Sequence, residues 1–211
     1  MAESVEKRPV FELSSGDLCL DLANTWGDRS RKAKDRLTGY AALLAWGRQA
    51  GVLSARDENR LARIARASPR KAERAFRSAV ELRETLYRLF SAAAAGRRLS
   101  ASDVAALNRR LEQSLPNLRL VHRNQGFDWA WSGSQSSLDR MVWPVVRAAA
   151  ELLTSDLCDR VRECDSETCN WLFIDRSRAG RRRWCDMKVC GNRAKARRHY
   201  RRRKESATSS P

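Results

Sequence analysis

The spacing of apolar residues predicts that residues 10–155 form a mostly helical region. Residues 10–13 have the composition of a short strand. In residues 16–26, apolar side chains recur at the spacing of one helix face, with polar side chains opposite. These apolar residues are Leu18, Cys19, Leu22, Ala23 and Trp26. A strand that carries Leu18, Leu20 and Leu22 on one face is the alternative for the same segment.

Each helix predicted next begins at residues suited to a first turn and ends before a glycine or a proline. The starts are Thr38, Ser54, Ser68 with Pro69, and Ser100, and the ends marked by a stop signal are Gln49, Ala95 and Leu115. Another apolar stripe predicts a helix over residues 138–152. Within it, Pro144 either kinks the helix or marks its true start.

A β-hairpin is predicted between the last two of these helices. Residues 118–123 and 127–131 each alternate between apolar and polar side chains, and turn-forming residues lie between them at 124–126. The fold class expected for residues 10–155 is therefore α+β, a mostly helical N-terminal domain with a small β-hairpin or sheet.

Paired cysteines define the chemistry of the C-terminal region. Two C-x4-C pairs are separated by fifteen residues, and their members are Cys164, Cys169, Cys185 and Cys190. Four thiolates at this spacing are the ligand set of one structural Zn²⁺, and they leave no open coordination position for catalysis. Free thiols, a redox pair and an iron centre are the alternatives. Cys19 and Cys158 lie outside the pairs and are expected to be packing residues.

The region around these cysteines has too few bulky apolar side chains to fold without the metal. Residues 171–174 are predicted to form a short strand, residues 176–183 a turn, and residues 192–204 a basic helix. Knuckle, hairpin, knuckle and helix together give a treble-clef-like Zn(Cys)4 finger. We expect this finger to span residues 160–204 and residues 205–211 to form a disordered tail.

The net charge of +17 is concentrated beside these cysteines. Residues 160–204 contain 16 Lys and Arg residues against 5 Asp and Glu residues, and so hold +11 of it. A local field of this sign attracts polyanions, of which nucleic acid is the commonest in a cell. The basic run has no apolar face, so no membrane partner is expected. A solvated basic tail without a partner is the alternative.

Duplex DNA is the expected partner, bound mainly through its phosphates. The contacts are expected from Arg178, Arg181, Arg182 and Arg183 in the turn and from Arg193, Lys195, Arg197, Arg198, Arg201 and Arg202 in the helix. RNA is the alternative partner. It is disfavoured because Tyr200 is the one aromatic residue of the basic run that could stack on an unpaired base.

One charged residue interrupts the apolar face of the long helix predicted after Pro69. Arg83 lies in the middle of that face, and a buried guanidinium without a partner costs several kcal/mol. An internal salt bridge is one solution, and its candidate partners are Asp21, Asp28 and Asp35. The other is a pocket in which Arg83 binds a small anionic ligand and Asp21 and Asn24 supply further hydrogen-bonding groups.

Short motifs in both halves of the chain resemble known families. The sequence Cys190-Gly-Asn-Arg193, together with residues 171–177 and Trp184, resembles the CGNR zinc finger. Residues 18–25 and 82–84 resemble the ABATE domain, which precedes that finger in the same family. The resemblance implies a transcription regulator with a stress-responsive sensor domain, and it identifies no ligand.

The sequence lacks the signals of a membrane protein, a disulfide-bonded protein or an enzyme. Its most apolar later stretch, residues 143–153, is interrupted by Pro144 and Arg147, so no membrane span is predicted and a cytoplasmic location is expected. In a reducing compartment the six cysteines would not form disulfides. There are two histidines, no glycine-rich phosphate loop and no nucleophile elbow, so an enzyme acting near Arg83 is disfavoured.

Overall fold

The computed structural model describes residues 9–27, 29, 35–123, 126–133 and 135–208, with residues 202–208 described by their backbone alone. The helices are α1 (Leu18–Ala23), α2 (Tyr40–Gln49), α3 (Ala55–Ala67), α4 (Pro69–Ala94), α5 (Ala101–Ser114), α6 (Trp143–Leu153) and α7 (Asn192–Thr208). The strands are β1 (Leu118–Arg123), β2 (Gly126–Trp131), β3 (Val161–Glu163) and β4 (Leu172–Ile174). Short 3-10 turns occupy Leu115–Asn117, Arg140–Val142 and Cys158–Arg160, and a π-helical turn occupies Met187–Gly191.

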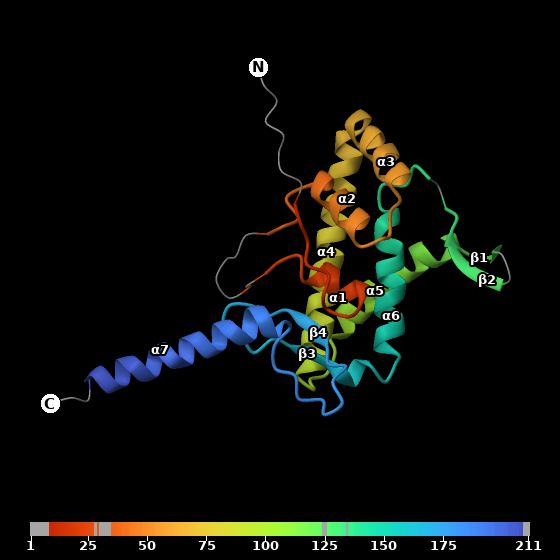
Figure 1. The fold of residues 1–211 in the computed structure, drawn as a ribbon. Coiled ribbons are helices and arrows are strands. Elements are labelled where there is room, and N and C mark those ends of the chain that lie inside the picture. The colour runs from red at the N-terminus through yellow and green to blue at the C-terminus, as the bar shows by residue number, and fades with distance from the viewer. Residues whose placement is uncertain (1–8, 28, 30–34, 124–125, 134, 209–211) are drawn as a thin grey trace, which may run out of the picture.

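The long helix α4 is the central element, and α1, α2, α3 and α5 all pack against it. Figure 1 shows α4 running through the height of the body, with α1 crossing near its middle. Because α1 lies between α4 and α6, Leu20 is as fully buried as Cys19 and Leu22, although it falls off the predicted apolar face. The helix predicted for this segment is confirmed, and the strand alternative is wrong.

The predicted start signals act as side-chain caps at α3 and α5, whereas Ser68 occupies the capping position of α4 without a side-chain cap hydrogen bond. Ser54 and Asp57 form a capping box at α3, and the hydroxyl of Ser100 accepts a hydrogen bond from a backbone N–H in the first turn of α5. Pro144 occupies the first turn of α6, so it marks the start of that helix and does not kink it. At α2 the capping position is Gly39, so Thr38 does not cap this helix as predicted.

Residues 10–13 do not form a strand, so that prediction is wrong. The side chain of Gln49, at the end of α2, holds this segment instead. Its Nε2 donates to the carbonyl oxygen of Pro9 at 2.8 Å, and its Oε1 accepts from the N–H of Phe11 at 2.9 Å. The extended chain therefore has a side-chain amide as its partner, where a strand would need a backbone neighbour.

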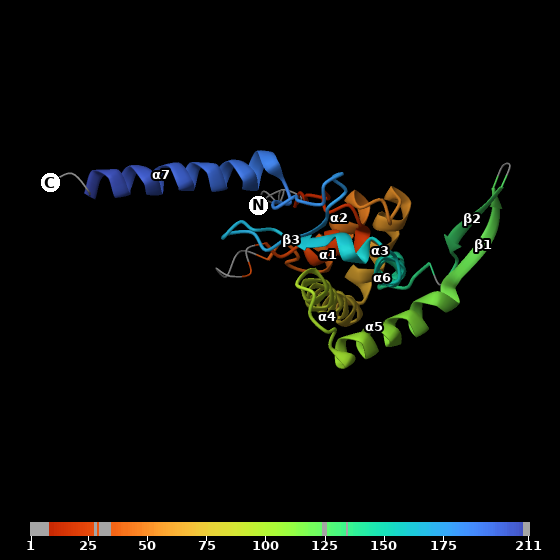
Figure 2. The same ribbon diagram turned by 90° about the horizontal axis from the view of Figure 1, so that it is seen from below.

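The predicted β-hairpin is confirmed as the antiparallel pair β1–β2. Leu118 lies opposite Trp131, and Arg123 lies opposite Gly126, while the predicted turn residues 124 and 125 fall outside the described part of the chain. Figure 2 shows the hairpin projecting from the body on the side opposite to α7.

A second antiparallel pair, β3–β4, joins the finger to the helical domain. Val161, Leu172 and Ile174 are buried in the same apolar core as residues of α1, α2, α4 and α6. Trp171 and Phe173 point to the other face, where they pack with the four paired cysteines. The small hairpin therefore lies between two apolar clusters, and the expected boundary between residues 155 and 160 falls in the connection from α6 to β3.

The basic helix α7 begins directly after the second cysteine pair and projects from the body, as Figures 1 and 2 both show. It continues to Thr208, beyond the predicted end at Lys204. Residues 205–208, which were expected in a disordered tail, therefore lie in the helix, and residues 209–211 lie outside the described part. At about 1.5 Å per residue, its 17 residues form a rod of roughly 26 Å.

Candidate metal centre and nucleic-acid interface

The sulfur atoms of the two C-x4-C pairs meet in one buried cluster. The Sγ atoms of Cys164, Cys169, Cys185 and Cys190 all lie within 4.8 Å of one another. The Sγ of Cys185 is 3.5 Å from that of Cys169 and 3.6 Å from that of Cys190. Four sulfurs held by one tetrahedral zinc at about 2.3 Å would be about 3.8 Å apart, so these thiols fit a single structural Zn²⁺.

The first knuckle is shaped by backbone hydrogen bonds. The N–H of Cys164 donates to the carbonyl oxygen of Trp171 at 2.8 Å, which continues the β3–β4 pairing past the end of β3. The N–H of Cys169 donates to the carbonyl oxygen of Ser166 at 3.0 Å. Asn170 then adopts a left-handed conformation, with φ of 59°, and turns the chain into β4. Both cysteines are thereby directed into the same cluster.

The second knuckle leads directly into α7. The carboxylate of Asp186 accepts from the N–H of Val189 at 2.8 Å, and its carbonyl oxygen accepts from the N–H of Cys190 at 2.9 Å. A Cβ atom at Gly191 would lie 2.5 Å from the Sδ of Met187, so glycine lets this methionine side chain lie against the backbone of the knuckle. Because α7 starts at the next residue, a metal bound at Cys190 fixes where the basic helix begins.

The thiols of the cluster shift one another's pKa. The pKa of Cys164 is well below its ordinary value, because the thiols of Cys169 and Cys185 donate hydrogen bonds to its sulfur. The same donation raises the pKa of Cys169 and Cys185. The cluster therefore favours one thiolate among protonated neighbours, and Zn²⁺ would displace the remaining thiol protons.

The turn over residues 176–183 is held by Asp175, whose side chain is buried. Its two carboxylate oxygens accept hydrogen bonds from the backbone N–H groups of Ser177 and Arg182, both at 2.9 Å. Burial alone would raise the pKa of Asp175, but these hydrogen bonds outweigh it and lower the pKa to about 2. The carboxylate is therefore ionised at neutral pH, and it would lose this role only as the pH falls from about 4 towards 2.

Some of the predicted nucleic-acid contacts have partners within the finger. The guanidinium of Arg182 lies over the ring of Phe173, 4.6 Å from its centroid, and donates to the carbonyl oxygens of Trp184 and Cys185. Arg183 donates to the carboxylate of Asp165 at 2.7 Å. The guanidinium of Arg182 therefore covers the ring of Phe173 on the apolar face of the finger.

Glu167 ties the first knuckle to α7. Its carboxylate accepts hydrogen bonds from Arg197, at 3.4 Å, and from Arg201. Arg197 also donates to the hydroxyl of Thr168 at 2.9 Å. These contacts stabilise the direction of α7, and the sequence analysis missed the role of Glu167 because an acidic residue between two cysteines carries no distinguishing pattern.

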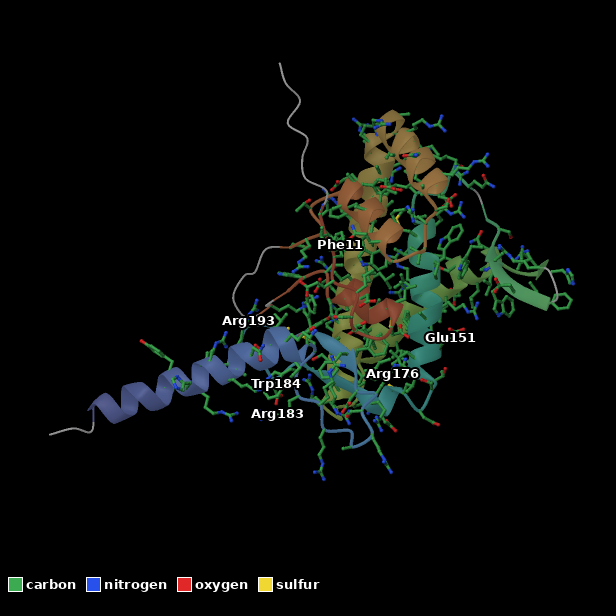
Figure 3. All side chains as sticks on the ribbon, in the orientation of Figure 1. Phe11, Glu151, Arg176, Arg183, Trp184 and Arg193 are labelled. Atoms are coloured by element: carbon green, nitrogen blue, oxygen red, sulfur yellow. The ribbon has the colours of Figure 1, made fainter. Side chains whose placement is uncertain are left out.

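The remaining predicted contacts point into solvent. Arg178 and Arg181 in the turn, and Arg193, Lys195 and Arg198 on α7, are exposed. None of these five has an ion pair with another residue in the described part of the chain. Figure 3 shows Arg193 above the start of α7, with Arg183 and Trp184 below it. The side chain of Arg202 lies outside the described part.

Arg83, predicted either to form a salt bridge or to bind a ligand, is 1% exposed and paired within the protein. Its guanidinium donates to both carboxylate oxygens of Asp35, at 2.7 and 2.8 Å, and to Glu84 at 2.8 Å. The salt-bridge interpretation therefore accounts for the buried charge, with Asp35 as the partner. Asp28, another candidate partner, lies outside the described residues.

The other two residues of the predicted ligand pocket also have internal partners. Asp21 accepts a hydrogen bond from the N–H of Ser15 at 3.1 Å, and burial raises its pKa. The amide of Asn24 is bound to the backbone of Leu172. The anion pocket at Asp21, Asn24 and Arg83 stays a prediction, and these hydrogen bonds argue against it.

The fold and the cysteine cluster define a class of protein, a helical domain followed by a structural zinc finger that carries a basic helix. Residues 16–156 match the family model of the ABATE domain, described as "Putative stress-induced transcription regulator". Residues 160–203 match the CGNR zinc finger. The chain therefore belongs to the ABATE family and ends in a CGNR zinc finger, which confirms both resemblances and, with the clustered cysteines, one structural zinc ion.

A search of curated proteins gave no match. In the part of the chain that the structure describes, no helix is long and apolar enough to cross a membrane.

Proposed function

We propose that this protein regulates transcription by binding duplex DNA through its zinc finger. The observation that carries the proposal is the set of exposed cations on the finger that have no ion-pair partner among the described residues. They are Arg178 and Arg181 in the turn and Arg193, Lys195 and Arg198 on α7. Such cations can contact phosphates without first breaking internal salt bridges. An ordered scaffold also avoids much of the conformational entropy that a flexible basic tail would lose on binding.

The shape of α7 suits insertion into a groove of duplex DNA. The major groove of B-DNA admits one α-helix, and α7 projects from the body (Figure 2). Its base is fixed by the second knuckle and by the contacts of Arg197 and Arg201 with Glu167. Phosphate contacts would dominate the affinity, and any sequence preference would come from an arginine that reaches a guanine edge.

Fluorescence anisotropy with a labelled duplex tests the proposal. The double variants are R178A/R181A, R193A/R198A and, as a control on the projecting hairpin, R119A/R123A. We expect each finger variant to lose about tenfold or more in affinity, because each removes two phosphate contacts, and the control to lose about twofold or less. Equal losses in all variants would assign the binding to bulk charge and contradict the proposal.

Competition with RNA tests the choice of nucleic acid. Tyr200 is 71% exposed on α7 and could stack on an unpaired base, which is the feature that favours RNA. We expect duplex DNA to compete at lower concentration than single-stranded or hairpin RNA of the same length. An RNA that displaces the duplex at lower concentration would assign the finger to RNA.

We further propose that the protein acts without catalysis and in the cytoplasm. Four thiolates fill the coordination sphere of the zinc, and the two matched families are of regulatory and zinc-finger type. The cytoplasmic location is supported by the six cysteines, all of which are free thiols in the structure.

A further inference from the structure

A second concentration of positive charge lies where α3 meets α4, outside the zinc finger. The single residue Ser68 joins the two helices, and Figure 1 shows their junction at the top of the body, whereas α7 leaves the body lower down. Residues 60–74 contain six Lys and Arg residues against one acidic residue, and so hold +5 of the net charge of +17. The helical domain therefore carries a basic surface of its own.

Most of the cations at this junction are exposed and unpaired. Arg60 is bonded to Asp57 and to Gln135, and the one acidic residue of the stretch, Glu73, is paired with Arg77 at 2.7 Å. The other five cations form no ion pair or side-chain hydrogen bond within the described part of the chain. We call these five the basic corner: Arg63 and Arg66 of α3, and Arg70, Lys71 and Arg74 of α4.

Like charges are neighbours on both helices of the basic corner. Arg63 and Arg66 are three residues apart on α3, and Arg70 and Arg74 are four residues apart on α4. Side chains at these spacings lie next to one another on a helix, so their repulsion destabilises it. Anions placed against the corner would offset this repulsion, and a surface of several unpaired cations attracts a polyanion.

The basic corner and the zinc finger open onto the same side of the molecule. Figure 2 shows α2 and α7 on the side of α4 that is opposite to α5. A hollow of about 1260 Å³ on this side is lined by parts of α2 and α3, including Arg63 and Arg66, and by the second knuckle and Arg193 at the start of α7. Because α3 and α7 lie at different heights of the body (Figure 1), a partner that contacts both must be long.

The length of α4 sets the separation of the two basic surfaces. This helix begins at the basic corner, and its 26 residues span about 39 Å at about 1.5 Å per residue. Towards its other end, the hydroxyls of Tyr87 and Ser91 donate to the carboxylate of Glu163 on β3 of the finger. One turn of B-DNA is about 34 Å long. A duplex held by the finger can therefore present phosphates to the basic corner about one turn away.

We propose that the basic corner is a second contact with the phosphate backbone of the duplex that the finger binds. This inference rests on the proposed function and extends it, because it gives the helical domain a direct part in DNA binding. The cations of the corner neutralise phosphates and add affinity without sequence preference. The protein then covers a longer stretch of DNA than the finger alone.

Fluorescence anisotropy with duplexes of two lengths tests the second contact. A stem of about 8 base pairs spans about 27 Å and is too short to reach both surfaces, whereas a duplex of about 30 base pairs reaches both. We expect R66A/R70A/R74A to lose about tenfold or more in affinity for the long duplex and about twofold or less for the short stem. On the long duplex, its log-log salt slope should be shallower than that of the wild type by about 2–3.

The charge-matched control is R109A/R119A/R123A, which removes three exposed arginines from α5 and the projecting hairpin. It should lose about twofold or less on either duplex. The melting temperature of R66A/R70A/R74A should equal or exceed that of the wild type, because the substitutions relieve like-charge repulsion. This measurement separates a lost contact from a lost fold.

Equal losses in the corner variant and the control, or equal losses on both duplexes, would overturn the inference. A corner variant that binds the long duplex as the wild type does would overturn it too, and the proposed function would stand if R178A/R181A still lost affinity. A loss in the corner variant with none in R178A/R181A would instead contradict the proposed function. Anionic phospholipid vesicles that bind the wild type and not the corner variant, with DNA affinity unchanged, would assign the corner to a membrane surface.

Discussion

The side chain of Asn24 pairs with the backbone of Leu172 as a neighbouring strand would. Its Nδ2 donates to the carbonyl oxygen of Leu172 at 2.8 Å, and its Oδ1 accepts from the N–H of the same residue at 2.9 Å. Both residues are buried, and Leu172 pairs on its other side with Glu163 of β3. The end of α1 therefore completes the edge of the finger's hairpin, and the helical domain and the finger are held together by backbone recognition as well as by apolar packing.

Replacing Asn24 by Ala should destabilise the whole protein. The substitution leaves a buried N–H and a buried C=O of Leu172 without partners, which should cost about 2–4 kcal/mol. Urea unfolding followed by circular dichroism measures the loss. Asn108→Ala, on the exposed side of α5, is the control and should change stability by about 0.5 kcal/mol or less. Equal stability of the two variants would show that the pairing contributes little.

Removal of one metal ligand should release the zinc. Cys169→Ser is expected to lose the single zinc ion, as measured by elemental analysis of the purified protein, because three thiolates hold zinc far more weakly than four. Cys158→Ser is the matched control, since Cys158 lies outside the cluster, and should keep the metal. Because β4 belongs to the main core, metal loss should also lower the melting temperature of the helical domain. A Cys169→Ser protein with full zinc content would refute the ligand assignment.

The turn that carries Arg178 and Arg181 should loosen when Asp175 is replaced by Asn. The amide keeps the shape of the carboxylate but loses its charge, and hydrogen bonds to a charged group contribute about 1.5–3 kcal/mol each, more than neutral ones. Trypsin cleaves after arginine, so the initial rate of cleavage within residues 176–183 reports the opening of the turn. Asp128→Asn on the projecting hairpin is the control. A turn cleaved at the same rate in Asp175→Asn and in the wild type would rule out this role.

Glu167 competes with phosphate for two arginines of α7, so its neutralisation should strengthen DNA binding. Glu167→Gln weakens the hold on Arg197 and Arg201 and removes one negative charge from the interface. We expect affinity to rise about two- to fivefold, an effect of the size of one exposed ion pair. The control is Glu151→Gln, which removes an exposed carboxylate paired with Arg147 on α6. Weaker binding by Glu167→Gln would mean that losing its hold on the direction of α7 outweighs removing its competition with phosphate, and would contradict the prediction.

Features encoded by local spacing could be predicted from the sequence. The two C-x4-C pairs predict the metal cluster, and the Ser54 and Ser100 caps predict the starts of α3 and α5, because each signal involves residues a few positions apart. The β1–β2 hairpin follows from alternation on both sides of a short turn. In each case the chemistry that forms the element is contained in the segment itself.

Partners brought together by the tertiary fold could not be predicted in this way. The sequence predicts Asn24 as a member of an anion pocket, whereas its actual partner, Leu172, is 148 residues away. The extended residues 10–13 are satisfied by Gln49, and nothing in their own pattern distinguishes this from a strand. Which arginines of the finger are paired and which have no ion-pair partner among the described residues likewise depends on where Glu167 lies in space.

The salt dependence of duplex binding tests the central claim most directly. Log-log plots of affinity against salt concentration have a slope of about −0.9 for each phosphate neutralised. The variant R178A/R181A/R193A/R198A removes four exposed cations of the finger, so its slope should be shallower than that of the wild type by about 3–4. A slope equal to that of the wild type, or a wild-type affinity that salt does not change, would contradict the account.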